Sequence, residues 1–285
     1  MTGRRISLGR LKGAPQAAVI GVALAVVLLA ALVSALVAPG GGGSDAHAAS
    51  PTGDQKGGTQ HASVPPGSTG SHTPATTPPT TVAAVPDSIV HQAEAPGKAV
   101  NITIDDGPDP LWTPRVLEVL KRHHVHATFC MIGPQAKANP ALVRRVVAEG
   151  HRLCDHTVTH NESMDHRDFA YQQKEIMDAL DMIEDASGGA PVQYYRAPGG
   201  AFTPASRALA AKNGMRPLGW NVDTKDYTRP GVGTIMATVK GEISNGPTVL
   251  FHDGGGDRSQ TVTALDQTLT WLAQQGYTFS FPKVR

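Results

Sequence analysis

Two short groups of residues near the middle of the chain combine side chains that bind catalytic metal ions. His156 and His160 are four positions apart, which lets both imidazoles lie on one face of a helix or turn and share one cation. Asp105 and Asp106 directly follow an apolar run at residues 99–104. Two histidines and one carboxylate leave a coordination position open for water, and the second carboxylate is then a natural general base for hydrolysis.

Three further polar groups follow along the chain, each near the end of a predicted strand. They are RAPGG at 196–200, DTKDY at 223–227 and LFH at 250–252. Active sites of α/β barrels assemble at the carboxyl ends of the strands. We therefore expect these groups to lie beside the two metal-binding groups and to complete one catalytic site.

The elements that must position these groups alternate between strands and helices. Short apolar or β-branched runs predict strands at 99–104, 127–132, 151–154, 193–196, 219–222 and 248–251. Apolar residues at helical spacing predict helices that begin at 114 and that cover 140–149, 169–186, 205–212 and 263–274. Strands that alternate with helices favour an α/β fold with a parallel sheet or barrel.

The five polar groups, in this order, resemble the motifs of the NodB-homology polysaccharide deacetylases, carbohydrate esterase family 4. The family motifs are TFDDG, H(S/T)xxH, RxPxG, DxxD(W/Y) and LxH, and the resemblance extends from about Ala99 to Phe281. It implies a distorted (β/α) barrel and metal-dependent removal of acetyl groups from polymeric sugars. Gly199 stands where many members have Tyr, so an aromatic groove wall is lost that Phe202 or Trp220 could replace.

The resemblance implies a metal centre and a general base. Asp106, His156 and His160 would bind one divalent metal. Zinc is the expected ion, and cobalt and nickel are alternatives because ligand type constrains the metal only loosely. Asp105 would activate the attacking water as general base, and Arg196 would pair with Asp105 and orient it.

The resemblance also implies a general acid and a sugar-binding wall. His252 would protonate the leaving amine, and Asp226 would keep His252 cationic, with Asp223 as the weaker candidate for that role. The backbone N–H of Gly199 would stabilise the oxyanion. Tyr227 would line the sugar groove.

The only two cysteines, Cys130 and Cys154, lie on consecutive predicted strands, which we expect to be neighbours. A disulfide between them is permitted if the domain is outside the cytoplasm. The alternative is a pair of buried apolar thiols. The Asp-His-His set already supplies three protein ligands, so neither cysteine is expected to bind the metal.

The first 94 residues differ from the rest in composition. Residues 1–16 carry four cations, 17–38 are apolar, and 39–94 are rich in Gly, Ser, Thr and Pro, which predicts a disordered linker. A helix over 17–38 would be about 33 Å long, enough to cross a membrane, and the preceding cations would stay cytoplasmic. We expect an uncleaved signal anchor; the alternative is a signal peptide cleaved near Ala48. Both place the domain at 95–285 outside the cytoplasm.

Charge and composition argue against nucleic acid as a partner of the predicted domain. Positive and negative side chains are almost balanced in the whole chain, with 25 Lys+Arg and 24 Asp+Glu, and there is no Lys/Arg run. A nucleic-acid-binding surface is therefore not expected. Residues 95–285 fit the size of one domain, which we expect to be a monomer.

The sequence therefore predicts a membrane-anchored, metal-dependent hydrolase that removes acetyl groups from N-acetylated glycans. The expected substrates are peptidoglycan N-acetylglucosamine or chitooligosaccharides, and a location beside the cell wall favours peptidoglycan. An O-acetyl xylan-type esterase on the same fold is one alternative, and a catalytically silent glycan-binding module on a membrane stalk is another. A phosphotransferase with Asp105 as nucleophile would leave the histidine pair without a role.

Overall fold

The computed structural model describes residues 84–285. The predicted cytoplasmic segment at 1–16, the predicted anchor at 17–38 and the linker up to residue 83 lie outside the described residues. Within residues 84–285, every helix is too short or too polar to span a bilayer.

The described chain is built around a curled sheet in which every strand pair is parallel. The strands are β1 (Ala99–Asp105), β2 (Thr128–Met131), β3 (Arg152–Asp155), β4 (Val192–Tyr195), β5 (Arg216–Pro217), β6 (Val222–Asp223), β7 (Thr248–His252) and β8 (Thr278–Phe279). Their order is β5-β4-β3-β2-β1-β7-β6, and β8 pairs with the beginning of β1. The predicted parallel sheet is confirmed as a half-barrel, and the carboxyl ends of all its strands except β8 lie at one edge.

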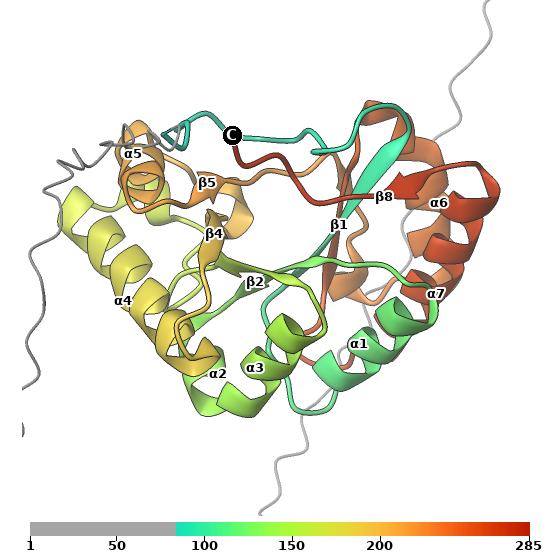
Figure 1. Cartoon of the computed structure of the whole chain (residues 1–285), viewed down its shortest axis with the longest axis horizontal. Coiled ribbons are helices and arrows are strands. Elements are labelled where there is room, and N and C mark those ends of the chain that lie inside the picture. Colours follow the sequence, from blue (N-terminus) through green and yellow to red (C-terminus); the bar gives the residue numbers. More distant parts are fainter. Residues whose placement is uncertain (1–83) are drawn as a thin grey trace, which may run out of the picture. The chain divides into compact units, whose positions relative to one another are not determined.

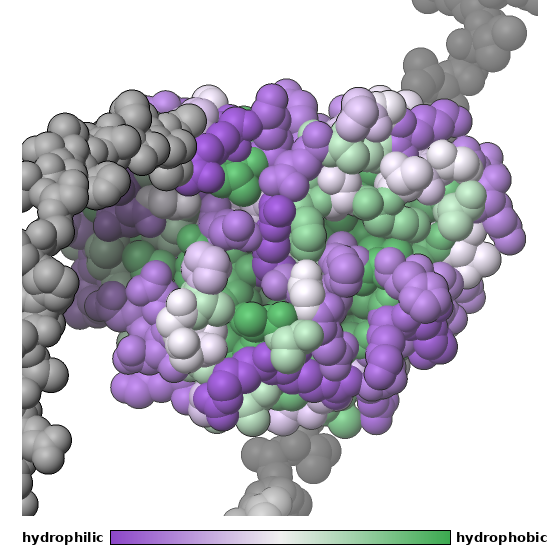
Figure 2. Space-filling view, viewed as in Figure 1, coloured by the Kyte–Doolittle hydropathy of each residue, from purple (hydrophilic) through white to green (hydrophobic). Residues whose placement is uncertain are grey.

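Helices connect the strands and surround the sheet on the left, lower and right sides of Figure 1. They are α1 (Thr113–Arg122), α2 (Gly133–Ala138), α3 (Pro140–Ala148), α4 (Phe169–Ser187), α5 (Pro204–Lys212), α6 (Val232–Glu242) and α7 (Ser259–Gln274). Short 3₁₀ turns are η1 (Met164–His166), η2 (Pro198–Gly200), η3 (Asp226–Thr228) and η4 (Ile243–Asn245). The pattern of apolar residues did not predict α2 or α6. In the space-filling view, hydrophilic residues cover much of this face, with hydrophobic residues visible between them (Figure 2).

Side chains alternate along the strands between two hydrophobic clusters, as expected for period-two backbone. Ile104 and Phe129 belong to the main core together with apolar residues of the surrounding helices. Cys130 and Cys154 belong to a smaller cluster whose other buried members are Val90, Tyr194 and Leu218. The two cysteines are directly paired across β2 and β3, and a disulfide joins them, which confirms the predicted cross-link.

The composition of the chain placed the start of the folded unit at residue 95, but residues before that position already pack against the domain. Val90 is fully buried and forms an isolated bridge with Leu218, just after β5. The backbone N–H of Val90 donates to the carbonyl of Pro217 at 2.8 Å, and Gly219 donates back to Val90 at 2.9 Å. Glu94 pairs with Arg152 at 2.7 Å. These contacts are made with residues more than 50 positions away, so local composition does not reveal them.

We expect Val90→Ala to destabilise the protein by about 1–3 kcal/mol, because it removes two buried methyl groups and leaves a cavity. The measurement is the free energy of unfolding in urea, with Val85→Ala as a control at a half-exposed position of the same segment.

A protein that begins at residue 95 should melt at a lower temperature than one that begins at residue 84. Equal stability of these two proteins would show that the segment contributes nothing to the fold.

Candidate active site

The predicted site residues meet at the carboxyl edge of the sheet. Asp105 is the last residue of β1, and the strand register places it directly beside His252 at the end of β7. His156 follows the end of β3, and Arg196 follows the end of β4. A cavity of about 290 Å³ opens here, and it is lined by all the predicted metal-binding, catalytic and sugar-binding residues except Asp226.

The three predicted metal ligands face one point. The ligand atoms of Asp106, His156 and His160 all lie within 4.8 Å of one another. Oδ1 of Asp106 is buried without a hydrogen bond, 3.2 Å from Nε2 of His160 and 3.6 Å from Nε2 of His156. Nδ1 of His156 lies 2.8 Å from the carbonyl oxygen of Arg196, which leaves Nε2 free to coordinate. One carboxylate and two imidazoles converging around an unsatisfied oxygen fit a divalent metal ion.

The charges within this triad favour the protonation state that a metal requires for Asp106 and His156. Burial raises the pKa of Asp106, but nearby His160 and His156 outweigh burial, so this pKa lies well below its ordinary value. Burial lowers the pKa of His156, although Asp105 and Asp106 oppose this shift. Asp106 is therefore a carboxylate and His156 a neutral imidazole near neutral pH, as ligands must be. Burial lowers the pKa of His160, but Asp106 and Asp105 raise it overall, so His160 must lose its proton when a metal binds.

The histidine pair lies in a turn rather than on a helix, so the turn alternative of the sequence prediction is the correct one. Thr157 and His160 adopt left-handed backbone conformations, with φ of 69° and 52°. Non-glycine residues rarely adopt this conformation, and buried carboxyl groups hold it here. Asp155 accepts a hydrogen bond from the N–H of Thr157 at 2.7 Å, and Glu175 accepts hydrogen bonds from the next two N–H groups. The turn brings His160 back toward Asp106.

Asp105 is a buried carboxylate whose orientation is fixed. Nη1 of Arg196 donates to Oδ1 of Asp105 at 2.6 Å and to the hydroxyl of Thr103 at 3.0 Å. The other oxygen, Oδ2, lies 3.5 Å from Nε2 of His156. One carboxylate oxygen therefore serves the ion pair, while the other faces the metal triad.

His252 is held as a cation by a buried carboxylate. Its Nδ1 lies 2.7 Å from Oδ1 of Asp226, and its backbone N–H donates to Oδ2 of the same residue at 2.9 Å. Thr261 donates to Asp226 at 2.7 Å. Burial lowers the pKa of His252, but Asp226, together with the charges of Asp105 and Asp106, raises it overall to about 9. With Nδ1 engaged, Nε2 is the nitrogen that can donate a proton.

The partner of His252 is Asp226 and not Asp223. Asp223 lies at the end of β6, accepts the backbone N–H of Lys225 at 3.0 Å and lines the cavity instead. Tyr227 lines the cavity as well, with its ring edge-on to His252 at 5.0 Å between centroids.

The cavity wall decides between two residues that the sequence analysis left open, and it includes one residue that the sequence analysis did not name. Of the two candidates for the aromatic wall, Trp220 lines the cavity, whereas Phe202 packs edge-on against Tyr195. Gly199 has a φ of 58°, and a Cβ there would come within 3.2 Å of the Glu162 side chain. Sequence reasoning missed Glu162 as a wall residue, and its position two residues after His160 was the only available signal.

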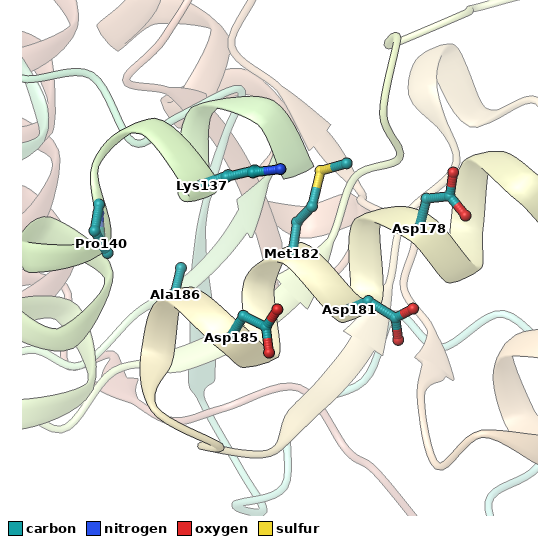
Figure 3. Close-up of a pocket in the computed structure, with 7 residues that line it drawn as sticks. All are labelled: Lys137, Pro140, Asp178, Asp181, Met182, Asp185 and Ala186. Carbon is teal, nitrogen blue, oxygen red and sulfur yellow. The ribbon is translucent and has the colours of Figure 1, made fainter.

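A second cavity lies between α2, α3 and α4, and it contains none of the predicted site residues. Figure 3 shows Asp178, Asp181 and Asp185 along α4 and Lys137 on the neighbouring helix. This cavity has no histidine and no converging ligand set. Among the described residues, the chemistry that the sequence predicts is confined to the strand edge.

Comparisons with known proteins agree with this geometry. The sequence profile described as polysaccharide deacetylase matches residues 92–218. The chain is 41% identical over 180 residues to a chitooligosaccharide deacetylase of Bradyrhizobium sp. (strain ANU 289), covering 62% of this chain and 82% of that protein. It is 39% identical over 184 residues to a peptidoglycan-N-acetylglucosamine deacetylase of Bacillus cereus, covering 64% of this chain and 85% of that protein.

A solved structure shares the fold. A carbohydrate esterase family 4 pseudoenzyme from Bacillus anthracis matches with a TM-score of 0.62 at 29% identity, covering 68% of this chain and 67% of that chain. Because the fold also occurs in a pseudoenzyme, the enzymatic assignment depends on the named deacetylase relatives and on the site residues described above. With these relatives, this profile and this site, the chain belongs to the polysaccharide deacetylase family and is a hydrolase of that class.

Proposed function

We propose that the protein removes the acetyl group from N-acetylglucosamine residues of a glycan, as a metal-dependent amidohydrolase. The observation that carries this proposal is the pairing of Asp105 and His252 in register on adjacent strands, both lining the cavity that holds the metal-binding triad. A carboxylate base and a cationic histidine acid are the two groups that amide hydrolysis requires. The relatives named above act on chitooligosaccharide and peptidoglycan N-acetylglucosamine.

The triad of Asp106, His156 and His160 would hold the metal ion, for which zinc is our proposal. A bound divalent cation would supply Lewis acidity that polarises the acetyl carbonyl and lowers the pKa of water. Cobalt and nickel suit the same ligands.

Asp105 and Arg196 act at the start of the reaction. Asp105 takes a proton from the attacking water through the oxygen that does not pair with Arg196. The guanidinium is fully buried and holds the other oxygen at 2.6 Å. This fixed orientation provides a base that needs no rearrangement when the substrate binds.

His252 acts when the carbon–nitrogen bond breaks. The amine is a poor leaving group, so nitrogen must receive a proton as the bond to the acetyl carbon is cleaved. Nε2 of His252 delivers this proton, and acetate and the free amine are the products. Asp226 stabilises the cationic form of His252 and fixes the ring. The backbone N–H of Gly199 is our proposed oxyanion donor, and Tyr227 our proposed sugar contact.

The location of the protein is part of the proposal. An apolar segment at 17–38 with preceding cations would anchor the protein and place the catalytic domain outside the cytoplasm. The disulfide between Cys130 and Cys154 supports this location, because disulfides persist in oxidising compartments. A silent glycan-binding module, the main alternative, has no use for a paired base and acid.

We expect Asp105→Asn to reduce acetate release by at least about 100-fold, because the general base is lost while the volume of the side chain is kept. Acetate release is measured from acetylated peptidoglycan and from chitooligosaccharides, each with added zinc and with a chelator. The control is Asp181→Asn, an exposed residue of α4. Full activity of Asp105→Asn, at equal metal content, would exclude this residue as the base.

We expect Asp226→Asn to shift the basic limb of the kcat/KM profile to lower pH by about one unit or more. In the native protein the pKa of His252 is raised to about 9, so the acid stays protonated through neutral pH and is lost only above that value. Without the carboxylate of Asp226, the proton is lost at lower pH. The profile is measured at saturating metal, with Asp181→Asn as control, and an unchanged basic limb would rule out this role of Asp226.

A further inference from the structure

The active-site cavity contains two carboxylates that the proposed reaction does not use, Glu162 and Asp223. Glu162 is exposed, belongs to the loop that carries His160, and stands beside the bare backbone of Gly199. Asp223 comes from β6, on a different side of the sheet order from the histidine loop. The two carboxylates therefore reach the cavity from two separate elements.

The outer part of this cavity wall carries two carboxylates and no lysine or arginine, whereas the positively charged groups of the lining, Arg196 and His252, are buried. Among the described residues, no lysine, arginine or histidine forms an ion pair with Glu162 or Asp223. Arg196 is the one lysine or arginine in the lining, and it is fully buried and paired with Asp105. A sugar chain that enters the cavity therefore meets hydrogen-bond acceptors and negatively charged carboxylates at the opening of the cavity, which we call its mouth.

Both carboxylates act on the same part of the mouth. The pKa of Tyr227 is raised, first by burial of its hydroxyl and then by the negative charges of Asp223 and Glu162. Because Tyr227 is 45% exposed and lines the cavity, these charges are felt where a bound glycan would pass and not only in the interior.

We infer that Glu162 and Asp223 select substrates by charge, favouring glycans whose sugars beside the reacting N-acetylglucosamine are cationic or neutral over glycans that carry carboxylates there. This inference rests on the proposed function and narrows its substrate class. Like charges across an interface oppose binding, and opposite charges favour it.

Selection by charge would distinguish chitooligosaccharides from peptidoglycan, the two substrate classes named so far. Neighbouring sugars in a chitooligosaccharide are uncharged, and each deacetylation creates an amine that becomes an ammonium group. In peptidoglycan, every second sugar carries a lactyl group whose peptide bears carboxylates. The charged mouth therefore points to chitooligosaccharides, and above all to partly deacetylated ones, in contrast to the preference for peptidoglycan that location alone suggested.

The test compares matched oligosaccharides with the metal-loaded full-length enzyme. Fully acetylated chitotetraose, chitotetraose with one glucosamine, and a soluble peptidoglycan tetrasaccharide with its peptides supply neutral, cationic and anionic substrates. The assay is run below the pKa of the sugar amine, at low and high salt. We expect kcat/KM to be about three- to tenfold higher for the cationic than for the anionic substrate at low salt, and the difference to shrink in high salt.

Substitution of the two carboxylates tests whether they cause the preference for cationic over anionic substrates. Glu162→Gln and Asp223→Asn should each reduce the ratio of cationic to anionic kcat/KM, mainly through KM, and the double variant should reduce it further. Asp181→Asn, which removes an exposed carboxylate of α4 outside the site, should leave the ratio unchanged. If the ratio in the double variant equals that of the native enzyme, the inference is wrong.

A binding measurement separates this inference from the proposed function. Fully deacetylated chitotetraose contains no acetyl group, so its affinity is measured without turnover. We expect the double variant to bind it several-fold more weakly than the native enzyme does, with the loss suppressed by salt. Absence of acetate release from every glycan would contradict the proposed function, whereas equal affinities of native enzyme and double variant would contradict the charge selection.

Discussion

The ion pair between Arg196 and Asp105 connects the catalytic edge to the interior of the sheet. The guanidinium is fully buried and donates to Asp105, to Thr103 and to the carbonyl oxygens of Leu218 and Gly219. A buried charge is tolerated only when it is paired and its remaining donors are satisfied. These bonds tie β1, the end of β4 and the chain after β5 together, so the base is positioned by the same contacts that neutralise the arginine.

Buried carboxyl groups position the other reacting groups in the same manner. Asp155 supports the turn that carries the histidines, and burial raises the pKa of Asp155 well above its ordinary value. Asp226 supports His252 through two hydrogen bonds. Each of these groups costs stability on its own, because burial disfavours its charge. The protein accepts this cost at one edge of the sheet, where it holds two ligands and an acid in fixed orientations.

Sequence patterns predicted the parallel sheet and the polar groups at its carboxyl edge, because strand periodicity and the polar residues after each strand are local signals, whereas the role of each residue came from the family motifs. They missed α6, whose Gly233 and Gly241 weaken helix propensity and whose helical state depends on buried Ile235 and Val239. They also placed the domain boundary too late, because the segment around Val90 is held by distant partners. Glu162 escaped prediction because an exposed carboxylate has no periodicity, and its place in the cavity depends on a left-handed turn.

The disulfide between Cys130 and Cys154 has a consequence for local opening of the sheet. Cys130 pairs with Asp105 in the strand register, and Cys154 is the residue before Asp155, which supports the histidine turn. The two cysteines are 24 positions apart in the sequence, and the chain between them contains α2 and α3. Partial unfolding proceeds in cooperative units. With β2 and β3 covalently joined, these two strands cannot move far apart, so the metal-binding turn that follows β3 stays close to β2, the strand that pairs with β1 beside the base.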